Sequence, residues 1–548
     1  MKKFLTVLAL ALALVMCAQS ALACTIVSVG KDATTDGSTI STHNDDSTSA
    51  DFRLWIIPSM EGGEGVTRDI VVDSHNYGDY GQFPEVVDYG KGYAINTLEQ
   101  PEDTYAYFHS RYSFINEKGV AMGEATFSYS AYDENSPYGK IYNSPLGANG
   151  ILDCWNVQDI ALERAATAKE AVEIMGSLIE KYGWGPTNGG GETINVCDGN
   201  EVWVFEAYGA DLWAAVRIPS NAFFVAANRA VINEFDFEDK ENYLCSPNLV
   251  SFAEENGLYN AETDGPFYPA QVYNAYHSAY GGMREWRAFT LADPDLGWEY
   301  DAERPFWPLY IEIAEDKKLS VRDVFDIKGD YYEGTEFDNS LTGYSGDFGN
   351  PLNFNSEYRT INMYRTCYVM IANVKAWLPD PIKCLVWYGY GAPDSTYITP
   401  LWPSMTRMPE FYSTGSRYED YTDESGWWVA TLVQDTATRN YDYAIEVIEE
   451  RRDARMEEIF AEVAENQEKW AAMYNAGFEA EAVEALTDYA CETAEEWFEI
   501  WKGLSNELIS DLVWSRVNVD GRISGGSYSD WWKGLTLGQR KPVEEPAA

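Results

Sequence analysis

Apolar and polar residues alternate over a short stretch that begins at residue 25. Apolar positions recur at every second residue through 25–29, a Gly-containing turn signal follows at 36–38, and residues 39–42 are again extended in character. Two such runs on either side of a turn are typical of a β-hairpin. The pattern therefore predicts a hairpin whose second strand brings the polar residues 43–46 back beside Cys24.

Patterns further along the chain indicate both helices and strands. Residues 158–182 carry apolar side chains at helical spacing, which predicts an amphipathic helix. Extended runs follow at 193–196, 201–205, 212–218 and 222–227. Periodicity alone thus predicts a chain of mixed α and β structure.

The later part of the chain divides into two patterns. Residues 331–421 are dense in Tyr, Trp, Gly, Pro and Asn, which predicts long surface loops packed by aromatic side chains. A platform that stacks on sugar rings is the functional alternative for these loops. Residues 436–512 are rich in Glu and Ala and predict helices, and the mixed charges within 446–466 indicate a solvated helix face.

The first residues have the three parts of a secretory signal peptide. Two lysines precede an apolar run at 4–16, and Ala-Leu-Ala at 21–23 forms a small-residue cleavage site. The apolar run is shorter than the ~20 residues that a membrane span needs, and no other run in the sequence is long enough. The sequence predicts a secreted or periplasmic protein from which residues 1–23 are removed, so that Cys24 becomes the N-terminus.

Composition narrows the range of partners. The chain has 88 acidic and 39 basic residues and a formal net charge of -49. Phosphates and anionic membrane surfaces are bound by Lys and Arg, so this balance excludes nucleic acid and an anionic membrane. The hydrophobic share of 45% excludes a disordered chain. A small-molecule substrate remains, and a homo-oligomer is compatible with the sequence.

The cysteine count singles out Cys24. Loss of residues 1–23 removes Cys17 and leaves an odd number of cysteines, so at least one thiol stays unpaired within the chain. Cys24 can be a half-cystine, a lipidated anchor or a nucleophile, although the anchor motif departs from its usual pattern at Ala21. An α-amine with a pKa of about 7.7–8.0 can accept the proton of a thiol with a pKa of about 8.5. The thiolate can then attack a carbonyl carbon.

The sequence contains no recognisable metal-binding motif. Its four histidines lie far apart and no C-x-x-C occurs. The glycines at 189–191 lack the Lys and Ser/Thr of a phosphate-binding loop, and the acidic loop at 236–241 lacks the ligand spacing of an EF-hand. We predict that the protein requires no metal and no other cofactor; full loss of activity in EDTA would contradict this.

A family resemblance is carried by residues 24–47, which read CTIVSVGKDATTDGSTISTHNDDS. This stretch resembles the N-terminal signature of the dipeptidases of peptidase family C69, which are N-terminal nucleophile (Ntn) hydrolases, and more distantly that of penicillin V and bile-salt acylases. The likeness recurs in order along most of the chain, at 115–120, 161–165, 190–192, 201–203, 227–229, 284–288 and 377–379. It implies an α+β fold, the Ntn-hydrolase four-layer αββα sandwich with a helical C-terminal extension.

The resemblance and the patterns described above together predict a domain organisation, and the resemblance implies an activity. Residues 24–430 would form the catalytic domain with aromatic-rich loop insertions, 431–535 a helical segment and 536–548 a flexible tail. The implied activity is hydrolysis of the peptide bond of dipeptides by a cysteine-type peptidase. The alternatives are an acylase that cleaves linear amides, of penicillin V or bile-salt type, and a lipid-anchored solute-binding protein.

Residue roles follow by position from the same resemblance. Cys24 would be the nucleophile and its amine the base, and Asp46 would lie beside that amine. Asn228 would donate to the oxyanion. The arginine that the acylases keep near the nucleophile would be Arg284 or, equally, Arg287. Either arginine is a candidate partner for the carboxylate of a dipeptide. An acidic side chain would bind the dipeptide amine.

Two positions depart from the family pattern. His43 precedes Asn44 where the family usually has Arg, and Thr126 stands where the acylases have a second oxyanion asparagine. Thr126 therefore favours the dipeptidase over the acylase. An imidazole has an ordinary pKa of about 6.5, so we expect the activity to depend on pH differently from that of an Arg-containing relative. A His43→Arg variant with an unchanged pH–rate profile would contradict this.

Overall fold

The structure, a computed structural model, describes most of the chain. The described residues are 24–48, 52–63, 65–72, 93–128, 133–185, 190–274, 279–354, 356–415, 419–513, 517–519, 522–524 and 530–538. The predicted signal peptide lies outside them, as do His75, His277 and the last ten residues of the predicted tail. Among the described helices, none combines the length and the apolar character needed to cross a membrane.

The first of two large sheets contains the predicted hairpin at its centre. Its strand order is β14-β12-β1-β2-β15-β16-β17, and every neighbouring pair is antiparallel. Ser28 of β1 pairs with Ser41 of β2, and His43 of β2 pairs with Met370 of β15. The strands are β1 (Ile26–Val29), β2 (Thr39–Asp46), β12 (Ala222–Ala226), β14 (Tyr310–Glu312), β15 (Thr366–Val374), β16 (Cys384–Tyr390) and β17 (Thr399–Leu401).

The second large sheet has the order β13-β11-β10-β9-β8-β7-β6-β3 and is also antiparallel. Its strands are β3 (Trp55–Ile57), β6 (Tyr107–His109), β7 (Ile115–Asn116), β8 (Ala121–Ser128), β9 (Gly190–Cys197), β10 (Val202–Gly209), β11 (Leu212–Ile218) and β13 (Tyr243–Cys245). Two further pairs stand apart from both sheets: β4 (Thr67–Val72) with β5 (Tyr93–Glu99), and β18 (Val517–Val519) with β19 (Arg522–Ser524).

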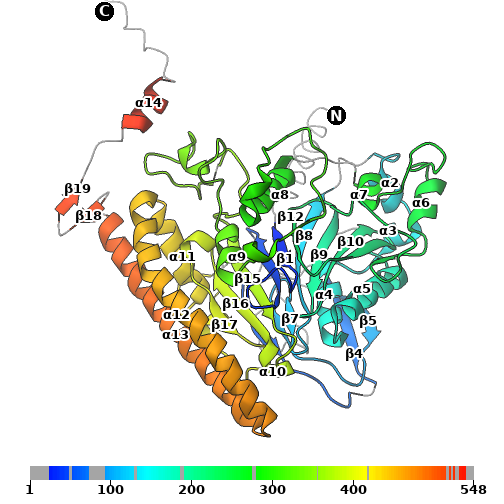
Figure 1. Ribbon diagram of the computed structural model, residues 1–548, viewed down its shortest axis with the longest axis horizontal. Coiled ribbons are helices and arrows are strands. Elements are labelled where there is room, and N and C mark those ends of the chain that lie inside the picture. Colours follow the sequence, from blue (N-terminus) through cyan, green and yellow to red (C-terminus); the bar gives the residue numbers. More distant parts are fainter. Residues whose placement is uncertain are drawn as a thin grey trace, which may run out of the picture.

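The two large sheets face each other, with β1 and β2 against β8 and β9 (Figure 1). The approach is close at Gly123, because a Cβ there would lie 2.4 Å from the carbonyl oxygen of Thr42. Successive side chains of β10 point to opposite faces of the sheet and so enter two different cores. Val204 belongs to the core that includes the space between the sheets, whereas Trp203 and Phe205 belong to a second core beneath helices.

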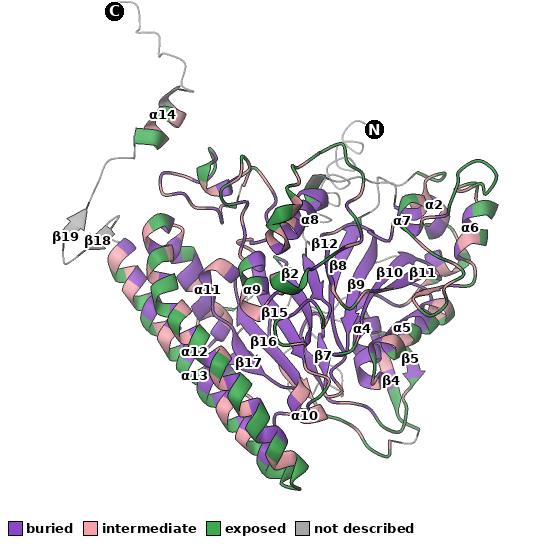
Figure 2. Ribbon diagram, viewed as in Figure 1, coloured by how far each residue is buried: buried purple, intermediate pink, exposed green. Residues whose placement is uncertain are grey.

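Helices pack on the outer side of each sheet, so the strands are buried almost throughout (Figure 2). α4 (Cys154–Arg164) and α5 (Ala168–Tyr182) pack on the eight-stranded sheet, and α8 (Ala279–Ala292), α9 (Val321–Lys328) and α11 (Gly426–Ala437) on the seven-stranded sheet. The layers therefore run helix, sheet, sheet, helix. The shorter helices are α2 (Pro137–Tyr142), α3 (Pro145–Asn149), α6 (Leu249–Glu255), α7 (Pro269–Tyr273), α10 (Asp380–Lys383) and α14 (Asp530–Gly538).

Two long helices, α12 (Tyr441–Asn475) and α13 (Glu479–Leu512), form an antiparallel pair along one side of the molecule (Figure 1). Gly477 lies in the turn between them with φ +89°, a conformation that glycine adopts without strain. Trp497 and Trp501 of α13 are fully buried and pack on Tyr397. Since these aromatic residues belong to the same core as the central strands, the helical pair is part of one packed body.

The prediction of mixed α and β structure is confirmed, and the strands are antiparallel. The helix predicted at 158–182 is instead two helices, because the hydroxyl of Thr167 accepts a hydrogen bond from the Glu170 amide and caps a new helix there. The prediction of loops across 331–421 is wrong for β15, β16 and β17. Their aromatic side chains, such as Tyr368, favour a buried strand as well as a loop. The predicted domain boundaries stay a prediction.

Candidate active site

Cys24 lies just before β1 and is fully buried. Its thiol donates a hydrogen bond to Oε1 of Glu124 on β8, over 2.9 Å. Burial raises the pKa of this thiol well above its ordinary value, and the charges of Glu124, Asp45 and Asp46 raise it further. The thiol is therefore protonated unless a base takes its proton. None of the seven cysteines in the described part of the chain forms a disulfide.

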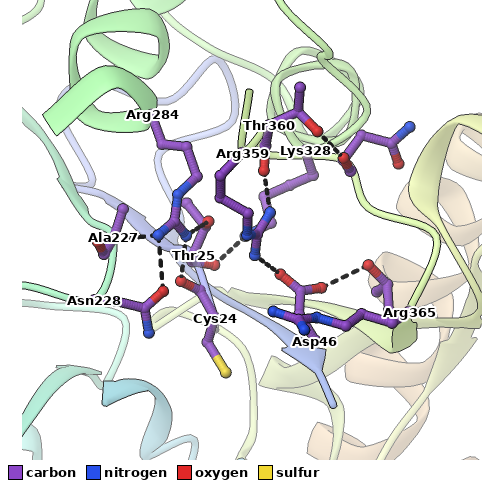
Figure 3. Close-up of polar contacts among 12 residues, drawn as sticks. Cys24, Thr25, Asp46, Ala227, Asn228, Arg284, Lys328, Arg359, Thr360 and Arg365 are labelled. Carbon is purple, nitrogen blue, oxygen red and sulfur yellow. Dashed lines mark hydrogen bonds and ion pairs between the residues drawn. The ribbon is translucent and has the colours of Figure 1, made fainter. Parts of the chain in front are cut away.

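Arg284, on α8, joins the nucleophile candidate to the end of β12 (Figure 3). Its Nη1 donates to the carbonyl oxygen of Cys24 and to Oγ1 of Thr25, each over 2.8 Å. Its Nη2 donates to Oδ1 of Asn228 over 2.8 Å and to the carbonyl oxygen of Ala227 over 3.2 Å. Burial and the nearby Arg359 lower the pKa of the guanidinium to about 10. Arg284 therefore fixes the backbone of Cys24 and the orientation of Asn228 together.

Asn228 follows β12 in a left-handed conformation with φ +56°. Asn is one of the few non-glycine residues found often in this region. Its Nδ2 donates to the carbonyl oxygen of Thr126 over 2.7 Å, while its Oδ1 accepts from Arg284. The amide group is thereby held with its N–H side toward β8.

Asp46 ends β2 and forms an ion pair with Arg359 (Figure 3). Its other oxygen, Oδ1, accepts a hydrogen bond from Oγ1 of Thr366 over 2.6 Å. Close by, Nζ of Lys328, the last residue of α9, donates to the carbonyl oxygen of Thr25. Burial lowers the pKa of Lys328 to about 7. The carboxylate of Asp46 therefore lies among cationic groups from distant segments.

His43 lies between Glu124 and Tyr368. Its Nε2 is 3.1 Å from Oε1 of Glu124, and its Nδ1 is 2.8 Å from the hydroxyl of Tyr368. The next residue, Asn44, is also fully buried, and its amide oxygen and nitrogen have no hydrogen-bonding partner among the described residues. Successive residues of a strand point to opposite faces, so the side chains of His43 and Asn44 lie on opposite faces of β2.

Glu124 is linked to a second buried carboxylate through Thr126. The hydroxyl of Thr126 lies 2.8 Å from Oε1 of Glu192 and 3.2 Å from Oε2 of Glu124. Burial and the charge of Glu124 raise the pKa of Glu192 well above its ordinary value. Burial opposes ionisation of Glu124 as well, but the hydrogen bond and charge of His43 lower its pKa. Of the two carboxyl groups, Glu192 is therefore the one that holds a proton.

The two candidate arginines, Arg284 and Arg287, make different contacts. Arg287 forms an ion pair with Asp330 over 2.7 Å and donates to the carbonyl oxygen of Glu333. Arg284 instead contacts Cys24. The structure thus brings Cys24, Asp46, Asn228, Arg284 and the pair His43 and Thr126 into one region, and leaves Arg287 in a separate ion pair.

Sequence reasoning did not single out Glu124, Lys328 or Arg359. Glu124 carries a signal, because an acidic residue within the otherwise small and apolar run of β8 is unusual for a buried strand. Lys328 and Arg359 carry none, since a basic residue at a helix end or in a loop is ordinary. Only the fold brings them within reach of Thr25 and Asp46.

Two clusters in the site have the ligand types of a metal centre. Sγ of Cys24, Nε2 of His43 and a carboxylate oxygen of Glu124 all lie within 4.8 Å of one another, and so do the ligand atoms of Glu124, Cys154 and Glu192. The members of the first cluster are far apart in sequence, so spacing did not reveal them.

Comparison with known proteins agrees with the resemblance carried by the N-terminal stretch. The profile of Peptidase family C69 matches residues 23–453. A probable dipeptidase of Latilactobacillus sakei is 29% identical over 74% of this chain and 79% of its own length. A dipeptidase of Bifidobacterium longum is 26% identical over 79% of this chain and 81% of its own, and a probable dipeptidase of Salmonella dublin is 28% identical over 70% and 82%. With a profile match that spans most of its length, the chain belongs to peptidase family C69.

Proposed function

We propose that this protein is an exported cysteine dipeptidase that hydrolyses dipeptides through an N-terminal Cys24. One observation carries the proposal. Cys24, whose thiol forms no disulfide, lies just before the central strand β1, and Arg284 donates a hydrogen bond to the backbone carbonyl oxygen of Cys24. The names of the similar proteins support the substrate class. The layered arrangement of helix, sheet, sheet and helix, with the nucleophile candidate beside the inner strands, supports an Ntn-hydrolase sandwich.

The proposed mechanism begins with removal of residues 1–23, which gives Cys24 a free α-amine. Burial and the nearby carboxylates raise the pKa of the thiol, so a base has to take its proton, and the free α-amine would be that base. The thiolate attacks the scissile carbonyl carbon, and the negative charge moves to the carbonyl oxygen. One N–H of Asn228 donates to Thr126 and Arg284 occupies its Oδ1, so its second N–H would donate to that oxygen. The protonated amine returns its proton to the leaving amine, and water then releases the acyl group.

The carboxylates beside the thiol suit a substrate with a free amino end. The α-ammonium of a dipeptide is two bonds from the scissile carbonyl carbon, so the group that binds it has to lie close to the attacking sulfur. Oε1 of Glu124 lies 2.9 Å from Sγ of Cys24, and Glu192 is joined to Glu124 through Thr126. A positively charged ammonium beside Glu124 would be stabilised by the negative charge of that carboxylate. Acylated amines lack this charge, which favours the dipeptidase over the acylase.

The test combines protein chemistry with a substrate survey. N-terminal sequencing and intact mass of the exported protein are expected to show a free Cys24, and a dipeptide library is expected to contain substrates, whereas penicillin V and bile-salt conjugates are not. Cys24→Ala is expected to abolish hydrolysis. Cys245→Ala, which changes a half-buried thiol on β13, is the matched control and is expected to retain it. A diacylglycerol adduct on Cys24, or a fully active Cys24→Ala protein, would contradict the proposal.

A further inference from the structure

The cluster of Cys24, His43 and Glu124 has the dimensions of a zinc site. Oε1 of Glu124 lies 2.9 Å from Sγ of Cys24 and 3.1 Å from Nε2 of His43. Bonds of about 2.0 Å to nitrogen or oxygen and about 2.3 Å to sulfur in a tetrahedral site place ligand atoms roughly 3.3–3.5 Å apart. Oε1 of Glu124 would therefore have to lie about 0.6 Å further from Sγ and about 0.2 Å further from Nε2, while Sγ and Nε2 lie within 4.8 Å of each other.

The ligand types favour zinc over magnesium and calcium. Thiolate, imidazole and carboxylate are the three side-chain ligands of zinc, whereas magnesium and calcium take oxygen ligands. All three side chains are fully buried. They come from three places in the fold, namely the segment just before β1, the strand β2 and the strand β8. The cluster is thus held by the facing sheets and does not depend on a loop.

An outer hydrogen bond fixes the imidazole in the orientation that a metal needs. The hydroxyl of Tyr368 lies 2.8 Å from Nδ1 of His43 and donates to the carbonyl oxygen of Tyr112 over 3.3 Å. When Nδ1 donates to the Tyr368 hydroxyl and that hydroxyl donates to Tyr112, Nε2 would exchange its hydrogen bond with Glu124 for a bond to the ion through its lone pair. Metal-binding histidines almost always make such a bond with the other ring nitrogen.

Acidic side chains other than Glu124 lie close to the cluster. Asp45 and Asp46 follow His43 on β2 and are fully buried, and Glu192 is joined to Glu124 through Thr126. On binding, Zn²⁺ would take the place of the thiol proton of Cys24, and that proton would be released to solvent.

We propose that Cys24, His43 and Glu124 form a Zn²⁺ site that reversibly blocks the nucleophile. The blocking role rests on the proposed function, because the sulfur lone pair that attacks the substrate is the one that binds the metal. The free amine of a processed Cys24 would add a fourth ligand, closing a five-membered chelate ring with the thiolate. The neighbouring cluster of Glu124, Cys154 and Glu192 is a poorer choice. It lacks an imidazole, and its thiol already donates to Gln158 over 3.3 Å.

The binding test uses the processed protein after treatment with a chelator. Zn²⁺ is titrated against a chromophoric competitor, and Co²⁺ is used as a spectroscopic probe. We expect one Zn²⁺ per chain and a thiolate-to-cobalt charge-transfer band. Cys24→Ser is expected to remove the band, and His43→Gln and Glu124→Gln to raise Kd at least about 100-fold. Tyr368→Phe is expected to raise it about 10-fold, as the loss of an outer partner does. Circular dichroism identifies any variant that fails to fold, and Cys24→Ser is close to isosteric.

Two control variants assign the site. Cys154→Ser and Cys245→Ser remove other thiols and are expected to leave the Zn²⁺ affinity within about twofold. Zn²⁺ that binds the Cys24→Ser protein as tightly as the native protein would overturn the proposal. Binding that is lost in Cys154→Ser and kept in Cys24→Ser would place the ion in the other cluster and would also overturn it.

A hydrolysis assay separates this proposal from the proposed function. Dipeptide hydrolysis that falls as the site fills, and returns on addition of chelator, supports the blocking role. Hydrolysis that continues at saturating Zn²⁺ overturns that role and leaves the dipeptidase intact. Cys24-dependent binding in a protein that hydrolyses no dipeptide overturns the dipeptidase and leaves the metal site standing.

Discussion

Nη2 of Arg284 donates to Oδ1 of Asn228 over 2.8 Å, and Nη1 of the same guanidinium donates to the carbonyl oxygen of Cys24 over the same distance. One side chain therefore sets the distance between the nucleophile candidate and the amide proposed to hold the oxyanion. An ammonium group has no planar fork and does not reproduce this double contact.

We expect Arg284→Lys to lower kcat for dipeptides by about 100-fold or more, the size of the loss when an oxyanion donor is misplaced. Steady-state kinetics on the folded variant measures it. Arg287→Lys is the comparison, because Arg287 lies one turn further along α8 and pairs with Asp330. If Arg287→Lys lowered kcat more than Arg284→Lys, the placement of Arg284 at the nucleophile would be wrong.

Two glycine substitutions are expected to change stability in opposite directions. Gly123→Ala would place a Cβ 2.4 Å from the carbonyl oxygen of Thr42, so the sheets would have to move apart. We expect a loss of about 1–3 kcal/mol in the free energy of unfolding, the usual cost of overpacking. Gly503→Ala lies on α13 with nothing within 4 Å of the new Cβ, and we expect a gain of about 0.5–1 kcal/mol. Denaturant melts measure both, and equal effects would contradict the close approach of the sheets.

Glu206 on β10 is expected to make stability depend on pH. Burial raises its pKa from 4.5 to about 7, although its carboxylate accepts hydrogen bonds from the hydroxyl of Tyr208 and the amides of Val231 and Ile232. The folded state therefore binds this proton more tightly than the unfolded state. The contribution is fully present below pH 4.5 and is lost as the pH rises to about 7. The loss is on the order of 3 kcal/mol, at about 1.4 kcal/mol per pKa unit.

The measurement compares the native protein with Glu206→Gln, which keeps the shape of the side chain and does not ionise. The difference in unfolding free energy between the two proteins is expected to change in favour of Glu206→Gln between pH 4.5 and 7. A difference that stays constant over this range would show that Glu206 does not titrate there.

The long helical pair is expected to contribute to the stability of the whole protein. Trp497 is fully buried and stacks on Tyr397 with ring centroids 5.0 Å apart. We expect Trp497→Ala to cost about 3–5 kcal/mol, as large core truncations do. Phe478, at the start of the same helix, is 54% exposed, and Phe478→Ala is expected to cost less than about 0.5 kcal/mol. Separate unfolding transitions for the strands and for α12 and α13 would contradict a single packed body.

Features that depend on contacts between residues near each other in the sequence could be predicted, whereas those that depend on contacts between distant residues could not. The hairpin of β1 and β2 was predictable because its contacts are local, and the polar residues at its end accordingly lie near Cys24. Glu124, Lys328 and Arg359 reach the same region from positions up to several hundred residues away. No local pattern encodes such contacts. The two arginines of α8 were indistinguishable in sequence, since both lie on one helix and only packing decides which one faces Cys24.

The position of β1 and β2 at the middle of their sheet has a consequence for the order of synthesis. These strands are made first, yet their neighbours β12 and β15 lie at residues 222–226 and 366–374. Both edges of the hairpin therefore stay unpaired until most of the polypeptide has been synthesised. Strand edges that stay unpaired for long can pair with other molecules, and pairing between distant segments slows folding. We expect β1 to be among the last strands to gain protection in refolding followed by hydrogen exchange, although it is translated before the other described strands.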